Sequence, residues 1–105
     1  MSEVIFNHLR QKVGYREDLA LAASKQLARH PEIEAELERV ILTGRAPTSA
    51  YTVVAFGKHF TAEALMKQYP LDLFEAYNYL AFLQEAPEEA VKLLDRGLPI
   101  KDKTS

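Results

Sequence analysis

Apolar residues recur at intervals of three and four through most of the chain, and this spacing predicts amphipathic helices. Ser2 can cap a first helix over about residues 3–13, because its hydroxyl can accept a hydrogen bond from a backbone amide of the first turn. A second helix is expected at residues 16–29, and a third at residues 32–42 after Pro31. The third has the clearest pattern, with an apolar stripe on one side and glutamates on the rest of its surface.

The last third of the chain repeats this pattern in shorter pieces. Thr61 can cap a helix over residues 62–68, and Asp72 can cap a longer one. Pro87 is expected to open a final helix. These segments together predict an all-α fold, a small single-domain bundle or orthogonal array of five to six short helices.

Residues 48–60 fit the helical pattern less well. Tyr51-Thr-Val-Val-Ala-Phe56 has the composition of a strand, but a strand needs a partner and no other segment offers one. We therefore favour a helix that begins at Thr48 and ends near Gly57. A strand that pairs with a second copy of the chain is kept as the alternative.

The length of the chain leaves room for one hydrophobic core, so residues 1–105 are expected to form one domain. Gly97 is expected to close the final helix, with Leu98 folding back against it. A flexible tail is predicted from about residue 101.

The composition is that of an ordinary globular protein. Of the 105 residues, 48% are hydrophobic and 27% are charged, the formal net charge is −2, and there is no cysteine. The lack of cysteine excludes disulfides and thiolate metal sites, and it fits a reducing compartment. No apolar run approaches the roughly 18–20 residues that span a membrane. We expect a cytoplasmic protein that has no membrane partner.

The sequence contains no recognisable motif for catalysis or cofactor binding. His8, His30 and His59 have none of the spacings that metal sites use, and we interpret them as a surface, a capping and a turn residue. The segment 44–49 has hydroxyls and an arginine but lacks the glycine spacing and the lysine of a phosphate-binding loop. We therefore expect no enzyme activity, no metal and no cofactor, and we nominate no catalytic residue.

The helix expected at residues 72–85 is apolar on nearly every side. Tyr79 and Phe82 fall on the arc opposite its core face, beside Glu75 and Asn78. A helix of this kind is either the central helix of a bundle or presents aromatic residues to a partner. The second alternative predicts that these four residues bind another protein or a second copy of the chain.

Residues 61–84 also have the outline of a helix-turn-helix motif. Its second helix carries acidic residues but no lysine or arginine, whereas DNA binding depends on neutralising phosphates. A DNA interface would have to use Arg10, Lys12, Arg16 and Lys58. We predict a non-enzymatic protein-interaction or regulatory module, with a small DNA-binding regulator as the alternative, and we do not expect nucleic acid as a partner.

Overall fold

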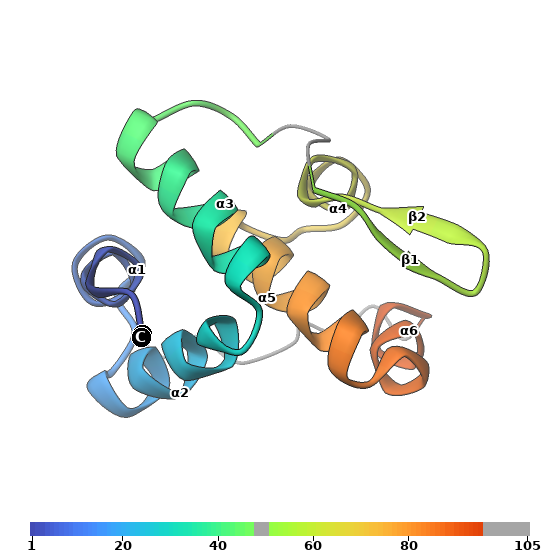
Figure 1. Cartoon of the computed structure of the whole chain (residues 1–105), viewed down its shortest axis with the longest axis horizontal. Helices are drawn as coiled ribbons and strands as arrows, with labels where there is room; N and C mark the ends of the chain where they lie inside the picture. The colour runs from blue at the N-terminus through green and yellow to red at the C-terminus, as the bar shows by residue number, and fades with distance from the viewer. Residues whose placement is uncertain (48–50, 96–105) are drawn as a thin grey trace. The chain divides into compact units, whose positions relative to one another are not determined.

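The computed structural model describes residues 1–47 and 51–95 of the chain. These residues form six α-helices, one π-helix and a two-stranded sheet, which confirms the predicted mostly helical fold (Figure 1). They divide into two compact units, of which the first is Met1–Arg45 and the second begins at Ala46. The single domain expected for residues 1–105 stays a prediction.

The first unit begins with α1, Glu3–His8, and continues into the π-helix η1, Leu9–Val13. Ser2 caps α1 as predicted, because its hydroxyl accepts a hydrogen bond of 3.2 Å from an amide of the first turn. The single helix expected here changes from α to π at Leu9. The Leu9 carbonyl accepts a hydrogen bond of 2.9 Å from the amide of Gly14, five residues later. Gly14 ends the π-helix with a φ of 88°, which glycine adopts without steric penalty.

Two longer helices complete this unit. They are α2, Glu17–Ala28, and α3, Pro31–Thr43, and both agree with the prediction to within a few residues. Pro31 begins α3 as expected, since its missing N–H is not needed in the first turn. Helices α1, α2 and α3 contact one another. The buried apolar side chains of the unit are Ile5, Leu9, Tyr15, Ala20, Ala23, Leu27, Ile33, Leu37 and Val40.

The second unit contains a β-hairpin where a helix was favoured. Strand β1, Val53–Ala55, pairs with β2, Lys58–Phe60, in antiparallel orientation. The helix predicted over residues 48–57 is therefore wrong, although its proposed cap Thr48 lies outside the described residues. The strand alternative had the right conformation, but β1 finds its partner in the same chain. His59 lies in β2 and not in a turn.

A two-residue turn joins the strands and explains why the hairpin forms. Phe56 and Gly57 have φ values of 53° and 72°. Positive φ at both positions is typical of a type I′ turn, whose twist matches that of the flanking strands. Val53 and Ala55 are buried and Val54 is exposed, which is the alternation of a half-buried strand.

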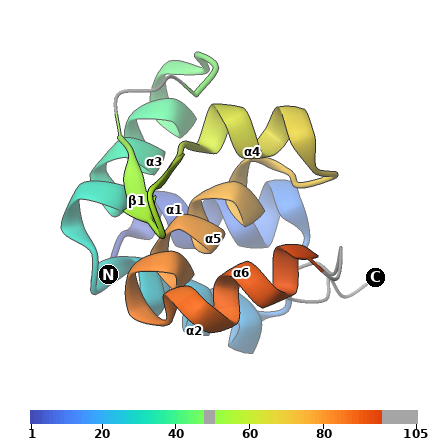
Figure 2. The ribbon, with the colours of Figure 1, turned by 90° about the vertical axis from the view of Figure 1, so that its right-hand side faces the viewer.

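Three helices follow the hairpin: α4, Ala62–Gln68, α5, Leu73–Glu85, and α6, Pro87–Asp95. Both α4 and α5 begin directly after their predicted capping residues. Helix α5 contacts both of the others and lies between them (Figure 2). The expected closing contact of Gly97 and Leu98 and the tail from residue 101 lie outside the described residues.

Candidate functional site

The four residues predicted to bind a partner lie on α5, and the structure buries three of them. Tyr79 and Asn78 are each 1% exposed and Glu75 is 4% exposed, whereas Phe82 is half-buried. The Tyr79 hydroxyl donates a hydrogen bond of 2.6 Å to the carbonyl of Ala90 in α6. The Tyr79 side chain therefore joins two helices of the same unit.

This burial corresponds to the alternative in which α5 is a central helix. A buried side chain cannot contact a second chain without rearrangement, so the partner-binding prediction on α5 now depends on Phe82 and stays a prediction. The helix-turn-helix outline meets the same difficulty. A recognition helix must present its side chains to the DNA groove, but nine of the 13 residues of α5 are buried.

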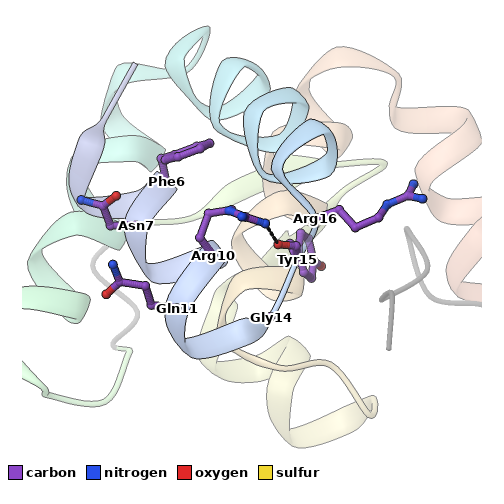
Figure 3. Close-up of a pocket in the computed structure, with 7 residues that line it drawn as sticks. All are labelled: Phe6, Asn7, Arg10, Gln11, Gly14, Tyr15 and Arg16. Carbon is purple, nitrogen blue, oxygen red and sulfur yellow. Dashed lines mark hydrogen bonds between the residues drawn. The ribbon is translucent and has the colours of Figure 1, made fainter.

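A groove of about 650 Å³ lies in the first unit, where η1 leads into α2. Figure 3 shows Arg10 reaching toward Tyr15, and its guanidinium donates a hydrogen bond of 2.9 Å to the Tyr15 carbonyl. Arg16 also lines the groove but points away from Arg10. The Arg16 guanidinium lies 3.4 Å from the carboxylate of Asp18, and both side chains are largely exposed. The hydrogen bond from Arg10 to Tyr15 thus stabilises the connection between η1 and α2.

The other polar residues of this groove are Asn7 and Gln11, one helical turn apart. Guanidinium and amide groups can bind a carboxylate or another anion through hydrogen bonds. The residues that line the groove offer no carboxylate or imidazole to act as a general base. Two basic residues considered for a DNA interface, Arg10 and Arg16, both line this groove but point apart, whereas Lys12 is not part of the lining.

The hairpin carries an exposed apolar surface, which we call the hairpin surface and define by Val54 and Phe56. These side chains are 60% and 61% exposed, and they are two of four large apolar residues exposed within the described ranges. Phe56 also has a left-handed backbone, which places its Cβ close to a carbonyl and costs roughly 1–2 kcal/mol in a residue other than glycine. Backbone strain of this kind is concentrated at functional positions.

An open groove of about 530 Å³ runs beside the hairpin surface. One wall is the run Thr52–Phe56, and the other consists of Leu83 and Gln84 at the end of α5 and Pro87 at the start of α6. The Gln84 amide donates a hydrogen bond to the hydroxyl of Tyr51, which directly precedes the Thr52–Phe56 wall. The groove therefore combines apolar side chains with the backbone of a strand.

Val54 and Phe56 are not among the predicted partner-binding residues, because both lie in the segment that was expected to be a helix. A signal for the hairpin is nevertheless present in the sequence. Phe56-Gly57 separates a valine-rich segment from Lys58–Phe60, and a two-residue pair that ends in glycine is a common hairpin turn. The signal was weak, since asparagine or aspartate usually precedes that glycine.

A comparison of the chain with protein families, curated proteins and solved structures finds no significant match. None of the helices in the described ranges is long and apolar enough to cross a lipid bilayer. Within the same ranges, no three histidine, aspartate or glutamate side chains are grouped so that they could hold a metal ion.

Proposed function

We propose that this chain is a cytoplasmic protein-interaction module that binds its partner through the hairpin surface, Val54 and Phe56. The observation that carries this proposal is the combination, at Phe56, of an exposed aromatic side chain and a strained backbone. Asparagine or glycine would suit the turn better. A residue that opposes local folding preference indicates a benefit outside folding. Buried aromatic anchors commonly supply much of the binding energy of protein interfaces.

The groove beside the hairpin supports a protein ligand over a small molecule. Small-molecule sites enclose most of the surface of their ligand. This groove is open along the strand, and the apolar side chains of Val54 and Phe56 extend its surface at one wall. An elongated partner can contact the whole length of such a surface.

A capture experiment with one variant and one matched control tests the proposal. The full chain is immobilised and exposed to lysate of its native cell as wild type, as Phe56→Asn and as Leu42→Asn. Leu42 is 70% exposed on α3, so its replacement also removes an exposed apolar side chain but leaves the hairpin intact. We expect specific proteins to be retained by the wild type and the Leu42 variant and to be lost with the Phe56 variant.

The captured partner is then purified and titrated against the three chains. We expect Phe56→Asn to weaken binding by about tenfold or more, which corresponds to about 1.4 kcal/mol. Equal affinity of all three chains, or the absence of any protein whose capture depends on Phe56, contradicts the proposed function.

A further inference from the structure

We infer that the outer edge of β1 binds an extended peptide segment by strand addition, and that this segment alternates apolar with basic residues. The inference rests on the proposed function and specifies the chemistry of the partner. In strand addition, hydrogen bonds to the backbone supply affinity, and side chains at alternate positions supply specificity.

The register of the hairpin gives β1 an outer edge with hydrogen-bonding groups. Ala55 pairs with Lys58 across the two-residue turn, and Val54 pairs with His59. In an antiparallel ladder, directly hydrogen-bonded pairs alternate with pairs that direct their backbone groups away from each other. The pair that closes a two-residue turn is a hydrogen-bonded one. The amide and carbonyl of Val54 therefore point away from β2.

The groove lies along this edge of β1. Side chains of a strand alternate between its two faces, so a groove over one face would be lined by every second residue. All five consecutive residues of Thr52–Phe56 line this groove. The strand therefore borders the groove with its edge, where the Val54 backbone groups can pair with an added strand. Leu83 and Pro87 form the opposite wall and can contact apolar side chains of that strand.

The residues that line the groove carry no charge, but two carboxylates directly follow them in sequence and favour a basic ligand. Glu88 and Glu89 directly follow the lining residue Pro87 in sequence, and both are exposed in the first turn of α6. We infer that lysine or arginine side chains of the bound segment pair with these carboxylates. Complementary charge of this kind selects among partners and accelerates association.

A second copy of the chain fits this edge less well than a single extended segment. Strand β1 has three residues, and two such strands placed edge to edge cover far less than the roughly 1,200 Å² that a stable protein dimer buries. Each copy would also bring its own Glu88 and Glu89 to the contact. A single extended segment needs less space than a second copy of the chain, and it can carry positive charge opposite Glu88 and Glu89.

The experiment titrates a short synthetic peptide of alternating lysine and valine into the full chain labelled with ¹⁵N. We expect the largest amide shifts at residues 52–56 and 83–89, and slower hydrogen exchange at the Val54 amide when the peptide is bound. A peptide of the same length that alternates glutamate and valine is expected to bind at least about tenfold more weakly at low salt.

Matched variants separate the strand edge from other contacts. Val54→Pro removes the amide that points into the groove, whereas His59→Pro removes the corresponding amide at the opposite edge of the hairpin. Neither amide is used in the ladder between the strands, and proline is tolerated at such edge positions. We expect a loss of about tenfold in affinity for Val54→Pro but less than about twofold for His59→Pro. Val54→Thr keeps the amide and should bind the peptide more tightly than Val54→Pro.

Four results overturn the inference: no binding of the lysine and valine peptide, shifts confined to other elements, equal affinity of the Val54→Pro and His59→Pro variants, or a dimer that forms through β1. Should Val54→Pro fail to fold, exchange at the Val54 amide of the wild type decides the question.

The proposed function fails separately, when no captured protein depends on Phe56. A partner that requires Phe56 but leaves the Val54 amide unprotected supports the interaction module and contradicts strand addition.

Discussion

Phe56 and Tyr79 show how differently two aromatic residues can be used in one small unit. Tyr79 is buried and donates its hydroxyl hydrogen bond to the Ala90 carbonyl, so its role is to join α5 to α6. Phe56 is 61% exposed and sits in a backbone conformation that most residues avoid. Tyr79 therefore stabilises the fold, whereas the backbone conformation of Phe56 opposes local folding preference.

Replacing Phe56 by asparagine should stabilise the chain. Asparagine adopts positive φ more readily and is favoured before glycine in a type I′ turn. We expect Phe56→Asn to raise the free energy of unfolding by about 1 kcal/mol in denaturant titrations. Phe56→Ala removes the same aromatic ring but lacks the polar side chain that favours this conformation, so it should bring no such gain. Equal stability of the two variants would contradict the assignment of strain to Phe56.

Replacing Tyr79 by phenylalanine should destabilise the chain. The variant leaves the buried Ala90 carbonyl without the tyrosine donor, and a lost hydrogen bond of this kind costs about 1–2 kcal/mol. Tyr69→Phe serves as the control, because Tyr69 is only half-buried and lies at the end of α4. Urea unfolding of both variants measures the difference, and an unchanged midpoint for Tyr79→Phe would show that the hydroxyl contributes nothing.

At the scale of elements, the ends of helices are specified by individual side chains. Asp72 and Glu75 form a capping box at the start of α5, in which each side chain accepts a hydrogen bond from the backbone amide of the other residue. Such a box satisfies two amides that the first turn would otherwise leave without partners. The start of α5 is therefore defined locally, independently of how the helix packs.

The capping box yields a prediction for α5. Asp72→Ala removes the acceptor for the Glu75 amide, and we expect it to lower the free energy of unfolding by about 1 kcal/mol. Asp72→Ser supplies another acceptor and should recover most of this loss. Thermal unfolding followed by circular dichroism compares the three chains. Alanine and serine variants of equal stability would show that the cap is unimportant.

The same local signals explain which elements could be predicted from sequence. Ser2, Pro31 and Asp72 mark helix starts through their own chemistry, so the positions of α1, α3 and α5 followed from the sequence. The position of the hairpin did not follow from the sequence, because its turn has Phe56 where asparagine is usual. Without a recognised turn, the segment directly after it was not seen as the partner strand. The candidate binding surface was missed for the same reason.

The burial of α5 could not be derived from its pattern. A helix that is apolar on nearly every side fits either a central position or an interface, and only the three-dimensional packing distinguishes them. Tyr79 and Asn78 proved to be buried, and Phe82 half-buried. Periodicity predicts which residues share a face but not what covers that face.

At the scale of the whole molecule, charge argues against nucleic acid as a partner. The formal net charge is −2, and the helix in the position of a recognition helix is largely buried. We therefore expect no binding to duplex DNA in a fluorescence-anisotropy titration at about 50 mM salt, where electrostatic binding is strong. Saturable binding that weakens when Arg10 and Arg16 are replaced would support the DNA-binding alternative instead.

Hydrogen exchange in the presence of the captured partner tests the central claim most directly. The full chain is compared with and without that partner by amide exchange and mass spectrometry. Binding through the hairpin surface predicts slower exchange in the peptides that cover residues 52–60 and unchanged exchange in α2 and α3. Protection confined to α1, α2 and α3, with the hairpin unaffected, would contradict it.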